Sequence, residues 1–99
     1  MPIGPNLPSF PWNHASIASN APIAAGVYAI FNGQNWIYVG ESGDTFTRLL
    51  QHWNGDNPCI TRNAPTGFQF ELVASQPQRK SRQDQLILLL HPVCNQKLG

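Results

Sequence analysis

The chain has 99 residues, which is the size of one small domain and leaves no room for a second. Its formal net charge is only +1, so no strong overall field attracts nucleic acid, and any basic surface must be local. No signal peptide or long apolar span is visible and the two cysteines lack C-x-x-C spacing, so we expect an intracellular protein with reduced cysteines and no membrane partner.

The first 22 residues are expected to form an irregular lead-in to a folded domain that spans residues 23–99. Prolines at positions 2, 5, 8, 11 and 22 remove backbone donors and interrupt helices. Two aromatic side chains of this segment, Phe10 and Trp12, either hold it against the domain or dock a partner or a second copy of the chain. We expect a monomer or a weak homodimer.

A β-hairpin is predicted next. Residues 27–31 and 36–39 are rich in β-branched and aromatic side chains, and an Asn-Gly pair lies between them. Tyr28 and Tyr38 share one face of such a hairpin only if paired residue numbers sum to an even value, which a two-residue loop would not give. We therefore predict an odd loop or a β-bulge that sets Tyr28 next to Tyr38.

Two helices and a third strand complete the predicted fold. Apolar residues recur at helical spacing from position 44 to 53, with Asp44 as the N-cap and Gly55 as the stop, and again from position 81 to 91. Residues 68–72 alternate as a strand does, and residues 57–67 form a loop or a short helical turn. The sequence predicts an α+β fold with a small three-stranded antiparallel sheet, a hairpin plus a third strand, flanked by helices.

Two polar residues of the first predicted helix are candidates for chemistry. Arg48 and His52 are four residues apart, so they share a face that lies about 130° from the apolar stripe and edges a cleft. Arginine offers a fork of donors to a phosphate, and histidine exchanges a proton near neutral pH. A solvated arginine beside a surface histidine also explains the pair and, for these two residues taken alone, is the simpler account.

The basic residues outside that helix cluster in part. Arg79, Lys80 and Arg82 form one run, and Arg62 lies upstream. They are candidate contacts to nucleic-acid phosphates, which position a ligand without reading its sequence. The alternative is an ordinary solvated helix start.

The ordered set of these motifs resembles the GIY-YIG nuclease family over residues 22–95. Each tripeptide alone is weak evidence, but the order and the spacing together are specific. The motifs, in chain order, are Gly26-Val27-Tyr28, Tyr38-Val39-Gly40, Arg48 to His52, and Leu86-Ile87 with Pro92 and Asn95.

The resemblance implies hydrolysis of nucleic-acid phosphodiester bonds, with DNA favoured as the substrate and one divalent cation, Mg²⁺ or Mn²⁺, as the cofactor. It implies that Tyr28 activates or orients the attacking water, with Tyr38 as its partner and His52 near the nucleophile. It also implies that Arg48 stabilises the charge on phosphorus and that Asn95 lies near the site. A free tyrosine, with a pKa near 10, is a poor base, so help from Arg48 or His52 is expected.

One position departs from the family pattern. The family holds its metal with a glutamate twelve residues before the asparagine, and here that position is Gln83, a neutral amide that should weaken metal binding and cleavage. Three explanations stay open: a deliberate substitution that traps substrate, a natural binder of nucleic acid that no longer cuts, or compensation by Glu41. A protein-interaction module on the same fold is a further alternative.

The two cysteines allow a second metal hypothesis. Cys59, Cys94, His52 and His91 would form a zinc site, but the spacing is loose and matches no standard finger. Buried apolar cysteines are the favoured interpretation.

Overall fold

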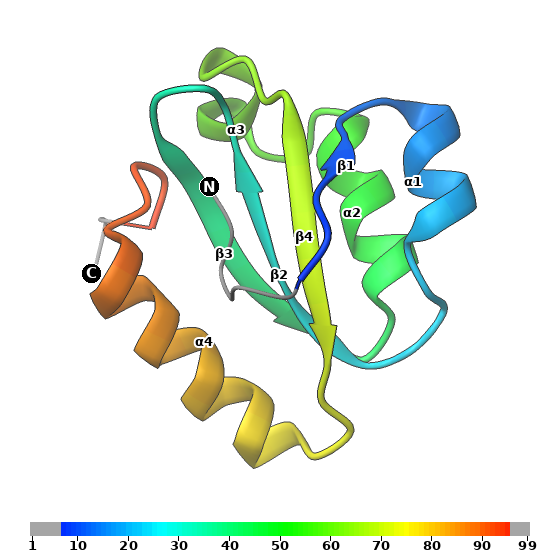
Figure 1. The fold of residues 1–99 in the computed structure, drawn as a ribbon, viewed down its shortest axis with the longest axis vertical. Helices are drawn as coiled ribbons and strands as arrows, with labels where there is room; N and C mark the ends of the chain where they lie inside the picture. Colours follow the sequence, from blue (N-terminus) through cyan, green and yellow to red (C-terminus); the bar gives the residue numbers. More distant parts are fainter. Residues whose placement is uncertain (1–6, 96–99) are drawn as a thin grey trace.

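The computed structural model describes residues 7–95, and these form a four-stranded antiparallel sheet with helices on both faces (Figure 1). The strand order is β1-β4-β2-β3, so β2 is paired on both sides. The elements are β1 (Phe10–Pro11), α1 (His14–Asn20), β2 (Gly26–Phe31), β3 (Trp36–Ser42), α2 (Thr45–Trp53), α3 (Pro58–Arg62), β4 (Gly67–Leu72) and α4 (Gln76–Leu90). The α+β class agrees with the prediction, but the sheet has four strands, not three.

The additional strand lies in the segment that was predicted to be irregular. That segment contains β1, which pairs with β4, and α1, which occupies a stretch without proline. The side chain of Asn13 caps α1 by accepting a hydrogen bond from the N–H of Ser16 at 2.8 Å, and Ile17 anchors the helix in the core. Phe10 and Trp12 are half-buried against aromatic side chains of β4, so they hold the segment against the sheet.

The hairpin contains the predicted bulge. Tyr28 pairs with Gly40 and Ile30 pairs with Tyr38, but the next pair shifts by one residue and leaves Ile37 as the extra residue of β3. On the side of the bulge away from the hairpin turn, the numbers of two paired residues therefore sum to an even value. Tyr28 and Tyr38 consequently point to the same face of the sheet.

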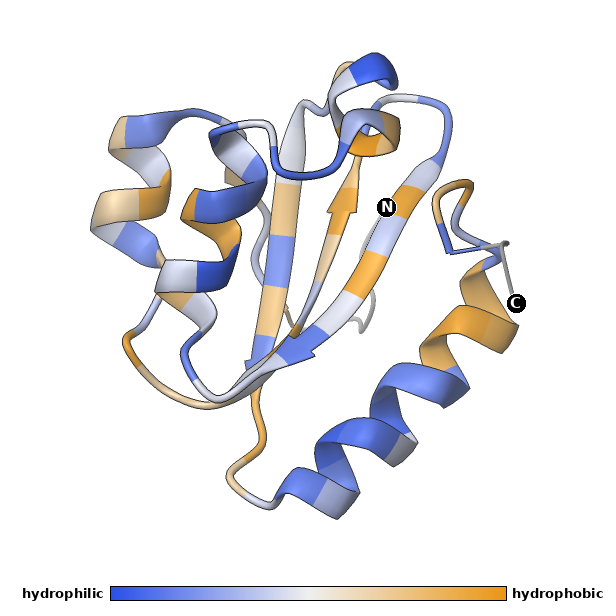
Figure 2. Ribbon diagram, turned by 180° about the vertical axis from the view of Figure 1, so that it is seen from behind, coloured by the Kyte–Doolittle hydropathy of each residue, from blue (hydrophilic) through white to orange (hydrophobic). Residues whose placement is uncertain are grey.

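The two faces of the sheet carry separate cores. One face packs against α1 and α2, and its fully buried members include Ile30, Leu49 and Phe68. The other face packs against α4, where Val39 and Leu86 are fully buried. Polar residues dominate the first turns of α4 and apolar residues its last turns, as Figure 2 shows. Among residues 7–95, no helix is long and apolar enough to cross a membrane.

The last helix begins earlier than predicted. It starts at Gln76, because Ser75 provides the N-cap and Pro77 is tolerated in the first helical turn. The polar residues of this first stretch carry no apolar periodicity, and the pattern therefore placed the start at position 81.

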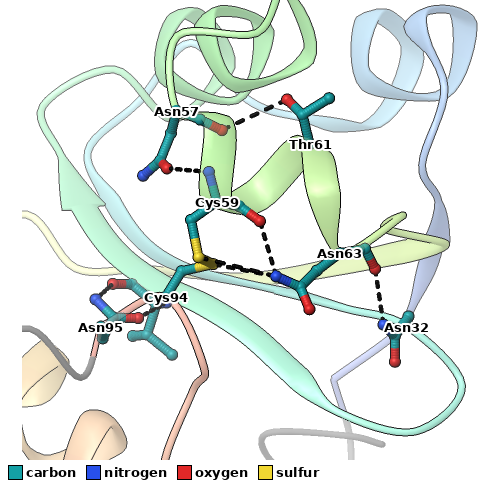
Figure 3. Close-up of a disulfide and its surroundings, with 8 residues drawn as sticks. Asn32, Asn57, Cys59, Thr61, Asn63, Cys94 and Asn95 are labelled. Carbon is teal, nitrogen blue, oxygen red and sulfur yellow. Dashed lines mark hydrogen bonds between the residues drawn. A yellow bond between two sulfur atoms is a disulfide. The ribbon is translucent and has the colours of Figure 1, made fainter.

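A disulfide joins Cys59 of α3 to Cys94, so the prediction of two reduced cysteines is wrong (Figure 3). The residues are 35 apart in sequence, but the chain after α4 runs along the free edge of β3 and reaches α3. Figure 3 also shows the amide of Asn63 beside the bond, donating to the carbonyl of Cys59 at 2.8 Å. Disulfides are rare in reducing compartments, so the expected intracellular location loses the support it took from reduced cysteines.

Candidate functional site

The two tyrosines lie side by side on the sheet face that carries α2. The ring centroids of Tyr28 and Tyr38 are 6.2 Å apart. The Tyr28 ring lies across Gly40, where a Cβ atom would overlap the tyrosine hydroxyl and lie 2.5 Å from Cζ. The glycine of the second motif therefore provides the space that the tyrosine of the first motif occupies.

The glycine of the first motif has a similar role toward α2. A Cβ atom at Gly26 would lie 2.8 Å from the hydroxyl of Thr45, the first residue of α2. The backbone N–H and the hydroxyl of Thr45 both donate to the carbonyl of Ala24, at 3.0 and 2.8 Å. Without a side chain at position 26, the start of α2 can approach β2 closely.

His52 faces the sheet, and the prediction that it edges an open cleft is wrong. Its residue surface is only 1% exposed, and the buried stripe of α2 runs through Thr45, Leu49 and His52. The apolar face of α2 that the sequence predicts is rotated from this buried stripe, because α2 also packs against α1. Trp53, at the end of the apolar stripe, is 39% exposed.

A chain of hydrogen bonds starts at Tyr28 and ends at a carboxylate. The hydroxyl of Tyr28 lies 2.8 Å from Nε2 of His52, and Nδ1 of His52 lies 2.8 Å from Oδ1 of Asp56. The Tyr38 ring packs on the His52 ring, with centroids 5.2 Å apart. Tyr28 and His52 are almost fully buried, whereas the Asp56 side chain is about a third exposed. The hydrogen-bonded series thus runs from the buried Tyr28 and His52 to Asp56 at the surface.

Asp56 was not predicted from the sequence. It follows Gly55, which has a positive φ of 89° and ends α2 in a Schellman motif: the N–H of Gly55 donates to His52, and that of Asp56 donates to Gln51. This turn folds the carboxylate back over the last helical turn. The four-residue spacing from His52 across a helix-ending glycine was the available signal.

Electrostatics distinguish the members of this chain. Burial raises the pKa of Tyr28, and the neighbouring Tyr38 adds to the rise while Arg48 opposes it. Burial lowers the pKa of His52. Partial burial would raise the pKa of Asp56, but hydrogen bonds from Arg48 and His52 outweigh it and lower that pKa. Near neutral pH the hydrogen-bonded series from Tyr28 to Asp56 therefore consists of a neutral phenol, a neutral imidazole and a carboxylate.

Arg48 lies at the exposed end of this chain. Its Nη1 donates to Oδ2 of Asp56 at 2.6 Å and to Oε1 of Gln51 at 2.8 Å, and a third of its side chain is exposed. Arg48 and His52 share a face of α2, as predicted, and the two oxygens of Asp56 connect them. The partly exposed guanidinium of Arg48 is thus connected through Asp56 to the buried imidazole of His52.

Asn95 is held on the edge of the sheet beside Tyr38. Its Oδ1 accepts from the N–H of Val39 at 2.7 Å, and its Nδ2 donates to the carbonyl of Val39 at 3.0 Å (Figure 3). The side chain therefore pairs with β3 as a neighbouring strand would. These two hydrogen bonds hold Asn95 against the free edge of β3.

Of the two candidate metal ligands, Glu41 lies on the sheet face that packs against α4, and Gln83 belongs to α4 itself. Glu41 accepts from Nε of Arg79 at 2.8 Å, and Arg79 also donates to the carbonyls of Val73 and Ala74. Gln83 is half-buried on α4. Residues 7–95 contain no group of three or more His, Cys, Asp or Glu side chains that could hold a metal ion. The disfavoured alternative of a zinc site is not formed either, because both cysteines are in the disulfide.

The four predicted phosphate contacts are not brought together as one patch. Arg79 is buried in its ion pair with Glu41, Arg82 pairs with Glu71, and Lys80 pairs with Asp84. Arg62 is exposed, and it is the one lysine or arginine of the described residues without a carboxylate partner. Little free positive charge therefore remains on the described surface.

The fold defines the class of protein that this chain resembles. Over 81% of its length the chain superimposes on GIY-YIG endonuclease domains, with TM-scores of 0.67 to 0.68, so it has the GIY-YIG fold and the prediction is confirmed. The solved structures are of the N-terminal endonuclease domain of UvrC from Thermotoga maritima, one bound to magnesium and others, point mutants, to a catalytic divalent cation. Identity is 20% to 21%, and 94% to 96% of the UvrC chains is covered. The sequence matches no protein-family model and no curated protein.

Proposed function

We propose that the chain is an endonuclease that hydrolyses phosphodiester bonds in nucleic acid, with DNA as the favoured substrate. The observation that carries this proposal is the convergence of Tyr28, Tyr38, His52 and Arg48 on one sheet face, in a fold shared with the UvrC endonuclease domain. Phosphodiester hydrolysis needs a cation for the charge that develops on phosphorus and a group that takes a proton from water. Arg48 supplies the first, and the chain from Tyr28 to His52 supplies the second.

The raised pKa of Tyr28 restricts how it takes part. A free phenolate is disfavoured at a buried site, so Tyr28 does not store negative charge before the reaction. In the proposed step a water oxygen bonds to phosphorus, its proton moves to the Tyr28 oxygen, and the Tyr28 proton moves to Nε2 of His52. The bond from phosphorus to the leaving oxygen breaks as the new bond forms, and the leaving oxygen keeps the electron pair and takes a proton from solvent. Tyr28 is a relay, and His52 is the proton acceptor.

A divalent cation, Mg²⁺ or Mn²⁺, is the cofactor that the resemblance implies, and its fit to this chain is poor. When bound, such an ion would stabilise the charge on the phosphate and leaving oxygens. Position 83 offers a neutral amide, and the carboxylate of Glu41 is engaged by Arg79 at 2.8 Å. We therefore propose that Gln83 attenuates cleavage by weakening metal binding and that Glu41 does not compensate.

Gln83→Glu tests this proposal. Nicking of supercoiled DNA in Mg²⁺ or Mn²⁺ should rise by about 100-fold or more, because a metal ion contributes several kcal/mol to charge stabilisation. Gln85→Glu adds the same charge to an exposed position of the same helix and should change little. Adding Tyr28→Phe to the Gln83→Glu chain should abolish the gain, and parallel assays on RNA and on single strands identify the substrate. If Gln83→Glu cuts none of these substrates, the nuclease proposal fails.

A nucleic-acid binder that no longer cuts is the second candidate, and the glutamine at position 83 favours it. Such a binder has few cations available for phosphate on the described surface. They are chiefly Arg62, which has no carboxylate partner, and Arg48, which is paired with Asp56 but partly exposed. Gel-shift affinity should fall only shallowly with salt, with a logarithmic slope of about −1 to −2, because each phosphate contact contributes about −0.9. A slope steeper than about −4 would show that more phosphate contacts exist than these residues supply.

A further inference from the structure

The two oxygens of Asp56 contact two different groups of the site. Oδ1 lies 2.8 Å from Nδ1 of His52, and Oδ2 accepts from Arg48 at 2.6 Å. We propose that Asp56 is a positioning residue, which holds His52 in the tautomer whose Nε2 accepts the proton of Tyr28. The consequence for rate rests on the proposed nuclease function, whereas the tautomer itself does not.

The tautomer follows from which groups can donate. An ionised carboxylate has no hydrogen to give, so the hydrogen between Oδ1 of Asp56 and Nδ1 of His52 must be on the imidazole. A neutral imidazole carries only one N–H, so Nε2 presents a lone pair to the Tyr28 hydroxyl at 2.8 Å. The phenol then donates to the imidazole. In the other tautomer Nε2 would donate to Tyr28 and would block the proton transfer.

The surroundings of His52 leave this assignment to Asp56. The polar groups that face the ring are Tyr28 from β2, Tyr38 from β3, Arg48 on α2 itself, and Asp56 just beyond α2. A phenol can accept as well as donate, so Tyr28 is compatible with either tautomer. Asp56 is the one group among these that accepts from His52 and cannot donate to it.

Asp56→Asn should reverse the tautomer while the backbone stays in place. The Schellman motif uses the backbone N–H of Asp56 and not its side chain, so the turn survives the change. Arg48 can only donate, so the amide oxygen of asparagine should turn toward Arg48 and its NH₂ group toward Nδ1 of His52. The imidazole hydrogen must then move to Nε2. The same substitution in a Ser-His-Asp triad lowers kcat by about 10⁴-fold through a wrong tautomer.

Nitrogen NMR of the histidine-labelled full chain tests the proposal without any assay of cleavage. The unsubstituted protein should show His52 with its hydrogen on Nδ1, and Asp56→Asn should move it to Nε2. His52→Gln assigns the signal among the three histidines of the chain. Asp84→Asn is the matched control, because Asp84 also pairs with a cation one helical turn away, Lys80 at 3.0 Å, but is remote from His52. An Nε2–H tautomer in the unsubstituted protein, or an unchanged tautomer in Asp56→Asn, would overturn the proposal.

Cleavage then separates this inference from the proposed function. In the Gln83→Glu background, Asp56→Asn should lower kcat by about 100-fold or more with little change in KM, since the Tyr28 proton loses its acceptor. The expected tautomers with no cleavage by any variant would support the positioning role and refute the nuclease. Cleavage that is insensitive to Asp56→Asn would refute the role of Asp56 in the reaction.

Discussion

Reduction of the bond between Cys59 and Cys94 is expected to lower the free energy of unfolding by about 3.8 kcal/mol. The bond closes a loop of 35 residues, and the chain-entropy relation for that length gives about 12.7 cal/mol/K, or about 3.8 kcal/mol at 298 K. The native contacts of the C-terminal segment do not depend on the bond: the N–H of Val93 donates to Trp36 at 3.1 Å, and that of Cys94 to Ile37 at 2.8 Å. Most of the loss should therefore come from the greater freedom of the unfolded chain.

Urea unfolding of the oxidised and the reduced chain measures this difference directly. The thermal midpoint should fall by roughly 15 °C or more on reduction, since about 1 kcal/mol corresponds to 4–8 °C in a domain of this size. A chain carrying both Cys59→Ser and Cys94→Ser should behave like the reduced protein and should not respond to reductant. Equal midpoints with and without reductant, or two reactive thiols in the protein purified without reductant, would refute the reasoning.

Two further predictions concern the site. Gly40→Ala should destabilise the fold by about 1–3 kcal/mol and displace the Tyr28 ring, because its Cβ would overlap the tyrosine hydroxyl; Gly33→Ala, whose Cβ meets nothing within 4 Å, is the control, and equal urea midpoints for the two variants would contradict the packing argument. Burial lowers the pKa of His52 in the folded protein below its value of about 6.5 in the unfolded chain. The stability that the neutral ring contributes is therefore present above about pH 6.5, and it is lost as the pH falls through the lower pKa of the folded state. Unfolding followed against pH should show this loss, His52→Gln should flatten it, and an unchanged profile in that variant would rule His52 out as its source.

Local patterns were sufficient for much of the site. Because a strand alternates its side chains with period two, parity sets the condition that Tyr28 and Tyr38 share a face only with an odd loop or a bulge, and the structure contains the bulge. The helix that carries Arg48 follows from apolar spacing and an N-cap, and Asp44 does accept from the N–H of Thr47 at 3.0 Å. Such features depend on residues within a few positions of each other, so they can be recognised without the fold.

Other features depended on distant parts of the chain. His52 is buried because α2 packs on the sheet through a stripe that is not its most apolar one. Arg79 is taken from the surface by Glu41, 38 positions away, which no local pattern of charge reveals. The fourth strand went unpredicted because its two residues form a strand only by pairing with β4.

By itself, the sequence determined the hairpin, the helix and strand that follow it and the last helix, the bulge or odd loop that a shared face of the two tyrosines requires, and the absence of a carboxylate at Gln83. The tertiary structure decided what those residues contact: the hydrogen-bonded chain from Tyr28 through His52 to Asp56, and the disulfide that closes the C-terminal segment onto α3. The physical reason is the distance along the sequence between the residues that interact. Backbone geometry repeats over two to four residues, so it is visible in the sequence, whereas the protonation of His52 depends on a strand and a helix end that meet only in the folded chain.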